Sequence, residues 1–406
     1  MSIYDNAGVA LIPSGTKASK LYSVLPANGD GDFTHSRGST ATRVNKDGLI
    51  ESVAADVPRL DYPLIDGEVQ DCPHLLLEPS RTNQFTYSES LNSGWSVGGV
   101  VMTLTASQFI SPDGSQNASR LEIPSTGSPS VFAQIESHSS GTQYTISVYA
   151  KSNTGTNQSF RLYGDYGASG NISSDFTATN EWQRFSYTFT ASASGSRGAG
   201  IYNTTNQSAD LQVYGIQFEQ GSYPSSYIPT SGTIATRSAD VCNGSGTSAE
   251  FNDSEGVLFA EITALANDST NRIISVSDGS GNNRALIKYD NSSNTIEASL
   301  TDGGVDQASL SNSYDILNTA KISFKYNSND FALWVNGFEV DTDSSGNTPS
   351  GLDTLNFDNG SGGSDFYGKT KQLMTFKTAL TDSELETLTS WDSFNAMAKG
   401  QLYTIE

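Results

Sequence analysis

The sequence predicts an all-β protein with two antiparallel β-sandwiches behind an extended N-terminal segment. Two observations carry this prediction. Apolar and polar residues alternate over many short stretches of residues 86–395, which is the period of a half-buried strand. Clusters of Gly, Ser, Thr, Asn and Asp separate these stretches, as in sandwiches with many turns. At 406 residues and 35% hydrophobic content, the chain can fill the cores of about two to three domains.

Residues 1–85 show little periodicity, and we interpret them as an extended segment with short strands at 21–24 and 48–53. Such a segment gains stability by packing on a partner rather than on itself. The run of three leucines at 75–77 argues against a purely flexible leader.

Residues 86–240 are predicted to form the first sandwich. Tyr144, Ile146 and Val148 share one face of a strand, and residues 185–189 repeat the pattern. The alternation changes phase within residues 211–218, which indicates a β-bulge.

Residues 241–395 are predicted to form the second sandwich, followed by a tail at 396–406 without a predicted role. Asn336-Gly337 is a strong two-residue hairpin turn between two strands. The Thr381-x-x-Glu384 pattern is a capping box that predicts one short helix near the end of the domain. Leu380 and Leu385 can pack around it as a hydrophobic staple.

The charge balance excludes several function classes. There are 44 acidic and 22 basic residues, and the net charge of −22 opposes binding to DNA, RNA or an anionic membrane. No apolar stretch approaches the length of a membrane-spanning helix. The first residues lack the basic start and apolar run of a signal peptide, so we expect a cytoplasmic protein or one assembled into a particle inside a cell.

The two cysteines, Cys72 and Cys242, are too few for a disulfide scaffold and match no zinc spacing. A bridge between them stays open, and two buried thiols are the preferred interpretation.

Residues 33–83 carry a family resemblance. They combine a Ser/Thr/Arg-rich stretch, an Arg-Leu-Asp-Tyr element at 59–62 and a run of leucines closed by Glu78-Pro79. This segment resembles the N-terminal segment of many tailed-phage structural proteins, and the Thr236-Arg237 element fits the same proteins. The resemblance implies a virion protein whose residues 1–85 anchor it to the particle.

Four arginines of this segment are candidates for docking on an acidic partner through bidentate pairs: Arg37, Arg43, Arg59 and Arg81. The open alternative is local pairing with Asp56, Asp61 or Glu78.

Both predicted sandwiches resemble carbohydrate-associated folds. The order of Trp95, the strand at 143–151 and the strand at 181–190 resembles a carbohydrate-binding-module jelly roll. The strings LWVNGFEV and LMTFKTAL resemble concanavalin-A-like, or laminin-G-like, domains. The second fold hosts lectins, hydrolases and inert spacers alike, so the resemblance does not name a ligand.

Glycan recognition combines aromatic faces with amide and carboxylate groups. Tyr163, Asp165 and Tyr166 form the most attractive candidate, because two rings flank an acid in a Gly-rich loop, and Trp95 is a further candidate. The alternative is that these aromatic residues belong to the core.

Metal chemistry and catalysis have weaker signals. Asp341 and Asp343 match the first half of an EF-hand loop, which makes Ca²⁺ a candidate cofactor, but Leu352 stands where that loop needs Glu. A Gly-containing loop between strands is the preferred interpretation. No nucleophile elbow, zinc-protease helix, phosphate loop or Glu-x-Asp-x-Glu strand occurs, so we expect no enzymatic activity.

These observations predict a phage decoration or fibre protein, displayed on head or tail after assembly in the host cytoplasm. It would contact other virion proteins and bind host or environmental glycans weakly through many copies. A homotrimer is expected from the resemblance to phage fibres. The alternatives are a tail depolymerase that cleaves polysaccharide and a spacer that binds no glycan.

Overall fold

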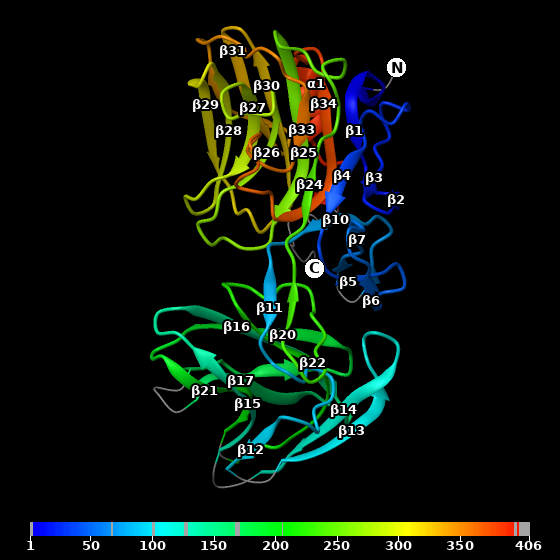
Figure 1. Cartoon of the computed structure of the whole chain (residues 1–406), viewed down its shortest axis with the longest axis vertical. Helices are drawn as coiled ribbons and strands as arrows, with labels where there is room; N and C mark the ends of the chain where they lie inside the picture. The colour runs from blue at the N-terminus through cyan, green and yellow to red at the C-terminus, as the bar shows by residue number, and fades with distance from the viewer. Residues whose placement is uncertain are drawn as a thin grey trace.

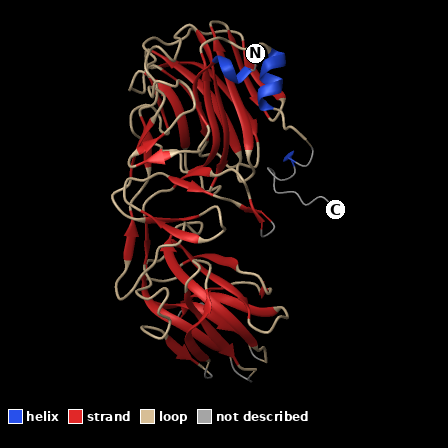
Figure 2. Ribbon diagram, turned by 90° about the vertical axis from the view of Figure 1, so that its right-hand side faces the viewer, coloured by secondary structure: helices blue, strands red, loops and turns tan. Residues whose placement is uncertain are grey.

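A computed structural model of the chain describes residues 3–65, 68–99, 102–125, 129–166, 171–204, 206–393 and 396–397. These residues form two β-rich lobes stacked along the long axis of the molecule (Figure 1). Strands make up nearly all of the regular structure in both lobes (Figure 2). Among the described residues, the helical elements are the 3-10 turn η1 (Ile3–Asn6) and the helix α1 (Asp382–Thr389), and residues 396–397 are also helical. The prediction of an all-β protein with antiparallel sandwiches is confirmed.

The lower lobe of Figure 1 is a sandwich of two antiparallel sheets. The strand order of one sheet is β13 (Thr103–Ile110), β14 (Gln116–Ile123), β22 (Ala209–Gln220), β16 (Gln143–Ser152) and β20 (Gln183–Thr190). The order of the other is β12 (Ser96–Gly98), β15 (Ser130–His138), β21 (Gly195–Asn203), β17 (Gln158–Tyr166) and β18 (Asn171–Ile172), with β19 (Phe176–Ala178) also on β17. Alternate residues such as Ile146 and Val148 enter the core between the sheets, opposite Phe160 and Leu162.

The predicted bulge is confirmed. The pairing of β16 with β22 shifts register between Ser147 and Tyr149. Gly215 in β22 has a positive φ of 59°, and a Cβ there would lie 3.2–3.3 Å from atoms of the Tyr149 and Tyr227 rings. Glycine therefore allows the strand to change phase without displacing these rings.

The upper lobe is a second sandwich. Its eight-stranded sheet runs β32 (Phe338–Asp343), β31 (Asp330–Val335), β30 (Ala320–Asn327), β25 (Glu255–Ala264), β34 (Gly368–Phe376), β10 (His74–Leu77) and β7 (Arg59–Asp61), with β1 (Ala7–Leu11) also on β34. The facing sheet runs β29 (Val305–Ser313), β28 (Thr295–Asp302), β27 (Arg284–Tyr289), β26 (Arg272–Ser277) and β33 (Thr354–Asn356). Leu258, Ile287 and Phe324 lie in the shared core.

Two local predictions in this lobe are confirmed. Asn336 and Gly337 both have positive φ, at 52° and 89°, and they join β31 to β32 as a two-residue hairpin. At α1, the Glu384 carboxylate accepts hydrogen bonds from the backbone N–H of Thr381 at 2.9 Å and from its hydroxyl at 2.7 Å. Leu380 and Leu385 are buried together in one apolar cluster, as the staple requires.

The N-terminal segment packs on the chain's own upper sandwich. The strands β1 and β10 both pair with β34, and β4 (Phe33–Ser36) pairs with β24 (Val241–Asn243). The remaining strands of the segment form short pairs: β2 (Thr16–Lys17), β3 (Lys20–Leu21), β5 (Ala41–Val44), β6 (Ile50–Val53), β8 (Leu64–Ile65) and β9 (Glu68–Val69). A segment without a pattern of its own thus finds its backbone partners at the edge of an existing sheet. The boundaries 86–240 and 241–395 stay predictions, and the tail at 396–406 lies almost entirely outside the described residues.

Two chain passages connect the lobes. The strand β11 (Arg81–Asn83) leads into the lower lobe, and β23 (Ala235–Arg237) leads back from it (Figure 1). The two strands pair with each other in antiparallel register. The lobes are therefore joined by a two-stranded ribbon rather than by one flexible linker.

A buried ionic network surrounds this ribbon. The Asp240 carboxylate accepts hydrogen bonds from His35 at 3.2 Å, from Arg37 at 3.0 Å and from Arg59. The Glu78 carboxylate lies 2.6 Å from Nη1 of Arg59. It also lies 2.9 Å from Nη1 of Arg237 and accepts the Ser226 hydroxyl proton at 2.6 Å. All the charged members of this network are buried.

This network corrects the docking role expected of two arginines. Arg37 and Arg59 are almost fully buried, so neither guanidinium can reach a partner protein. Local pairing, the open alternative, holds for both, and Arg59 pairs with the predicted Glu78. Arg43 is partly exposed and pairs with Glu51 at 2.7 Å.

The cysteines do not form a bridge, because both thiols are free. Cys242 is buried, as predicted, but Cys72 is exposed, which corrects the prediction of two buried thiols. Within the described residues, no helix has the length and apolar character needed to cross a membrane.

We predict that acid weakens the junction between the lobes. Burial alone would raise the pKa of Glu78, but the charges of Arg237 and Arg59 outweigh it and lower this pKa to about 2. Burial would likewise raise the pKa of Asp240, yet Arg59, Arg37 and His35 hold it well below its usual range. Because both pKa values are lowered on folding, their stabilisation is complete above about pH 5 and is lost as the pH falls toward 2. Glu78 alone contributes about 3 kcal/mol to this dependence.

Thermal unfolding followed between pH 7 and pH 2 measures the effect. The Asp240→Asn variant should be less stable by about 3–5 kcal/mol at pH 7 and less sensitive to acid, because it leaves buried arginines without their charge partner. Asp175→Asn, which removes a surface pair with Arg161, is the matched control and should change little. Equal stability of the two variants would contradict the role of the network.

Candidate ligand-binding cleft between the lobes

The aromatic residues predicted to bind a glycan do not form an open site. Tyr163 is 4% exposed and stacks on Tyr202, with ring centroids 5.4 Å apart. Asp165 is fully buried and accepts hydrogen bonds from the backbone N–H of Ser192 at 2.8 Å and from its hydroxyl. Neither side chain can contact a ligand as it stands, which corrects their assignment. The side chain of Tyr166 lies outside the described part of the structure.

Trp95 is half-buried and belongs to the core of the lower lobe. Its ring lies parallel to that of Phe132 at a centroid distance of 4.8 Å and also contacts Phe85. Its indole N–H donates to the Tyr87 carbonyl at 2.7 Å. The core interpretation therefore holds for this residue.

The carboxylates predicted to bind calcium accept hydrogen bonds from backbone N–H groups instead. Asp341 accepts the N–H of Ser311, and Asp343 accepts the N–H of Ser345, both at 2.9 Å. Among the described residues, no group of three or more His, Cys, Asp and Glu side chains could hold a metal ion. The Ca²⁺ hypothesis therefore finds no ligand set in this part of the chain.

A second aromatic surface, on the outer face of the sheet that contains β16 and β22, is covered by the chain itself. Tyr149, Tyr214 and Tyr227 gather there, and Ile50 from the N-terminal segment packs against them. The Thr42 hydroxyl donates to the Tyr227 carbonyl at 2.5 Å. This face is therefore an internal interface rather than an open binding platform.

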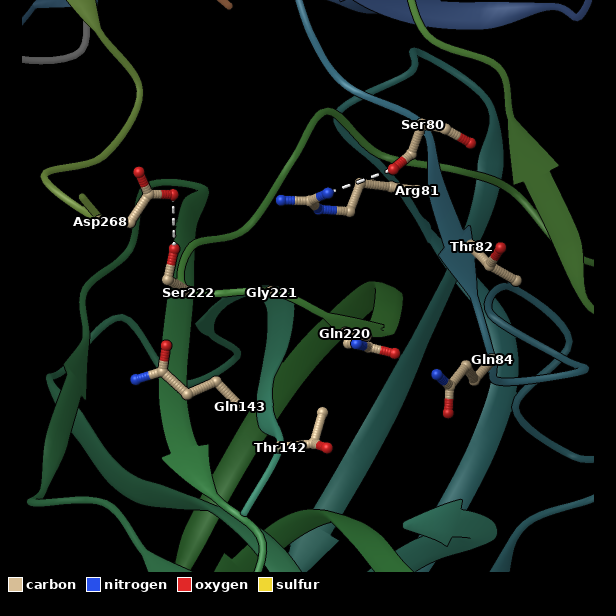
Figure 3. Close-up of a pocket in the computed structure, with 10 residues that line it drawn as sticks. All are labelled: Ser80, Arg81, Thr82, Gln84, Thr142, Gln143, Gln220, Gly221, Ser222 and Asp268. Carbon is tan, nitrogen blue, oxygen red and sulfur yellow. Dashed lines mark hydrogen bonds between the residues drawn. The ribbon is translucent and has the colours of Figure 1, made fainter. Parts of the chain in front are cut away.

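The open site is a polar cleft of about 580 Å³ where the two lobes meet (Figure 3). Its lining residues are Ser80, Arg81, Thr82, Gln84, Thr142, Gln143, Gln220, Gly221, Ser222 and Asp268. Residues 80–84 come from the connecting ribbon, residues 142–143 and 220–222 from the ends of β16 and β22, and Asp268 from a loop of the upper lobe. This volume is within the range of about 300–1,000 Å³ found for small-molecule sites.

Two contacts hold the walls of the cleft in place. The Ser222 hydroxyl donates to the Asp268 carboxylate at 3.0 Å, directly across the two lobes. The other oxygen of Asp268 accepts from Arg272 at 2.7 Å. Burial would raise the pKa of Asp268, but the hydrogen bond and charge of Arg272 and the bond from Ser222 lower it, so this carboxylate is ionised at neutral pH.

Three amide side chains face the cleft with free hydrogen-bonding groups. Gln84 is half-buried, whereas Gln143 and Gln220 are exposed. None of the three side chains makes a hydrogen bond to another group in the described part of the chain. An amide offers two N–H donors and an acceptor oxygen, the groups that a hydroxyl-rich ligand needs.

Arg81 extends across the cleft toward Ser222 and Asp268 (Figure 3). It was singled out in the sequence as a docking residue, and it is the member of that set whose guanidinium opens into this cleft. The amide residues could not be recognised in the sequence, because Gln and Ser at strand ends are common and their convergence depends on how the lobes pack.

A second hollow, of about 650 Å³, lies on the outer face of the eight-stranded sheet. Lys371 lies 3.2 Å from Glu261, and Lys321 donates to the Ser390 carbonyl at 2.9 Å and lies over the Trp391 ring. Nδ1 of His74 and Oε1 of Glu261 have no hydrogen-bond partner among the described residues. The lining of this hollow includes Leu64, Leu265 and Leu317, so the cleft between the lobes is the more polar of the two sites.

Comparisons with known proteins identify no family. No protein-family model and no curated protein matches the chain. Among solved structures, the chain is similar to the CBM40 of Ruminococcus gnavus IT-sialidase bound to alpha2,6 sialyllactose, with 15% identity over 34% of this chain and 85% of that one and a TM-score of 0.30. The tandem CBM22-1-CBM22-2 domain of Paenibacillus barcinonensis Xyn10C is similar at 12% identity over 78% and 94%, with a TM-score of 0.27. Domains LG4-5 of the mouse laminin alpha1 chain are similar at 7% identity over 76% and 92%, with a TM-score of 0.25. Likenesses this weak carry no functional conclusion.

We predict that Tyr163→Ala lowers stability without touching a ligand. Removing a buried aromatic side chain leaves a cavity and should lower the free energy of unfolding by about 3 kcal/mol. Denaturant unfolding measures this, and Tyr202→Ala, at the half-exposed partner ring, should cost less. A Tyr163→Ala protein of unchanged stability would refute its placement in the core.

Proposed function

We propose that this protein binds glycans in the cleft between its lobes and is displayed on the surface of a tailed-phage particle. One observation carries the binding proposal: the cleft gathers three unpaired amides, hydroxyl groups and a guanidinium on a surface fixed by contacts between the lobes. Saccharides present many hydroxyl groups that both donate and accept, and they match such a lining better than an apolar ligand would.

The lining also indicates how the glycan would be held. No aromatic residue is among the described residues that line the cleft, so hydrogen bonds rather than ring stacking would supply most of the contact. Hydrogen bonds to a wet, open cleft are weak one by one, because water competes for the same groups. Many copies on one particle would convert such weak sites into firm adhesion.

The phage part of the proposal rests on the sequence resemblance. In the structure, the segments that carry this resemblance contact one another. Arg59 and Glu78 from the N-terminal segment, with Arg237 and Asp240 from the returning ribbon, meet in one buried network. These two sequence segments therefore supply residues that join the two sandwiches. Display on the head or the tail, a homotrimeric state and contacts to other virion proteins remain part of the proposal.

We propose binding without catalysis. Glycosidases of the common type need two carboxyl groups on either side of the scissile bond. Among the described lining residues, Asp268 is the carboxylate, and its oxygens are held by Arg272 and Ser222. Incubation of polysaccharides with the protein should release no new reducing ends, and their release would favour the depolymerase alternative.

We predict that removing two amides from the cleft abolishes capture on a glycan array. The Gln143→Ala, Gln220→Ala double variant should lose the saccharides that the unaltered protein binds, by about tenfold or more, and should keep its thermal stability. The matched control is Gln108→Ala, Gln116→Ala, which removes two exposed glutamines of β13 and β14. No capture by the unaltered protein would favour the spacer alternative.

Antibody–gold labelling of intact particles tests the location. Label on tail tips or fibres would indicate receptor binding, and label over the head would indicate decoration. Particles without label would refute the virion assignment and leave glycan binding to be judged by the array.

A further inference from the structure

The guanidinium of Arg81 differs from its neighbours in the junction because most of its donors are unused. Arg37 donates to five acceptors: Asp240 and the carbonyls of Ser39, Val53, Ala54 and Val57. Arg59 donates to four: the Thr42 carbonyl, Glu78, Ser226 and Asp240. Arg81 makes one hydrogen bond, to the Ser80 carbonyl at 3.2 Å, within the described residues.

This lack of acceptors is notable because the Arg81 side chain is only 19% exposed. Its Nε is buried and has no hydrogen-bond partner in the described part of the chain. A charged donor removed from water without an acceptor lowers stability. The buried Nε is closed to a ligand in the cleft, but Nη2 is not buried and makes no hydrogen bond within the described residues, so it is free to donate to a ligand.

The surroundings hold the guanidinium in one orientation. It lies over the Tyr223 ring, 5.3 Å from the centroid. The backbone of Gly221, which has a φ of 153°, lies against the guanidinium. A Cβ at this position would be 3.0 Å from Nε and 3.1 Å from Nη2 of Arg81. The absence of a side chain at Gly221 thus lets the guanidinium lie against the backbone and face the cleft.

Nearby carboxylates do not satisfy this guanidinium. Glu219 is fully buried, and its nearest oxygen is 3.8 Å from Nε of Arg81, beyond hydrogen-bonding distance. Glu219 instead accepts from the Gln217 amide at 2.5 Å, and from the N–H and hydroxyl of Ser225 at 2.9 and 2.6 Å. Asp268 is paired with Arg272. Arg81 is therefore within ion-pair distance of Glu219 but keeps N–H groups that can donate to a ligand in the cleft.

We infer that the cleft selects saccharides that carry a carboxylate, such as uronic or ulosonic acid residues, and that Arg81 is the selecting residue. This inference rests on the proposed glycan binding. The planar carboxylate accepts a pair of N–H groups from Arg81, and Gln143 and Gln220 bind hydroxyl groups of the same or the next sugar. Charge-assisted pairs of this kind are about twice as strong as neutral hydrogen bonds, so the carboxylate supplies much of the affinity.

The test compares each saccharide captured on the array with its own methyl ester, which keeps the carbon skeleton and removes the charge. We expect captured saccharides to be carboxylated and to lose about ten- to hundredfold in affinity on esterification. Binding is measured at physiological ionic strength, where the protein's overall negative charge is screened beyond about 8 Å.

Variants assign the effect to Arg81. Arg81→Gln should weaken binding of the free acid to about the level of the ester and should weaken binding of the ester far less. Gly221→Ala keeps the charge of Arg81 but displaces its guanidinium, so it should also weaken binding of the free acid. Arg161→Gln, at a surface pair on the same lobe, is the matched control and should bind as the unaltered protein does. Thermal unfolding of each variant shows whether it is folded.

The outcomes separate the two proposals. Capture of neutral saccharides, of sulfated ones alone, or of esters as tightly as acids would overturn the carboxylate inference and leave glycan binding in place. Equal losses for acid and ester in Arg81→Gln would also overturn it. Capture of no saccharide at all would overturn both proposals.

Discussion

The buried carboxylate of Asp240 is the group on which the arrangement of this protein most depends. It accepts hydrogen bonds from His35, Arg37 and Arg59 of the N-terminal segment, and it lies just after the strand β23 that returns from the lower lobe. Glu78 repeats the arrangement with Arg59 and Arg237. Buried charges of this kind stabilise a structure only when every member is paired, so the network tolerates few alternative positions of the chain. Ser226, which follows the last strand of the lower sandwich, donates to Glu78 from its backbone N–H and its hydroxyl and so connects that lobe to the network.

The N-terminal segment links this network to both sandwiches. Its strands β1 and β10 extend the eight-stranded sheet of the upper lobe along β34. Residues 42–50 contact the outer face of the lower-lobe sheet that contains β16 and β22. The tyrosines of that face are consequently used for packing between segments. An aromatic surface that could hold a flat ligand in an isolated sandwich is closed here, whereas the polar cleft between the lobes stays open.

The cleft gains its properties from the same geometry. Its residues come from the ribbon, from two strand ends and from a loop of the other lobe, and a rigid junction keeps them at fixed positions. Binding to such a preformed site loses little conformational entropy, because the side chains need not first be gathered. Both terminal nitrogens of Arg59 donate to buried acceptors, whereas Arg81 makes a single hydrogen bond within the described residues. This contrast distinguishes the arginine of the buried network from the one available to a ligand.

The sequence by itself determined the features whose signals lie within a few residues. The alternation in β16, the Asn336-Gly337 hairpin and the Thr381–Glu384 capping box are local, since each depends on neighbours in one strand, turn or helix end. The tertiary structure decided the rest. Arg59 and Asp240 are 181 residues apart in the sequence, and Ser222 and Asp268 are 46 residues apart. No local sequence pattern therefore predicts either contact. The same reason explains why Tyr163 and Asp165 looked like an exposed site and proved to be buried. Burial depends on which segments cover a strand, and that is set by packing between distant parts of the chain.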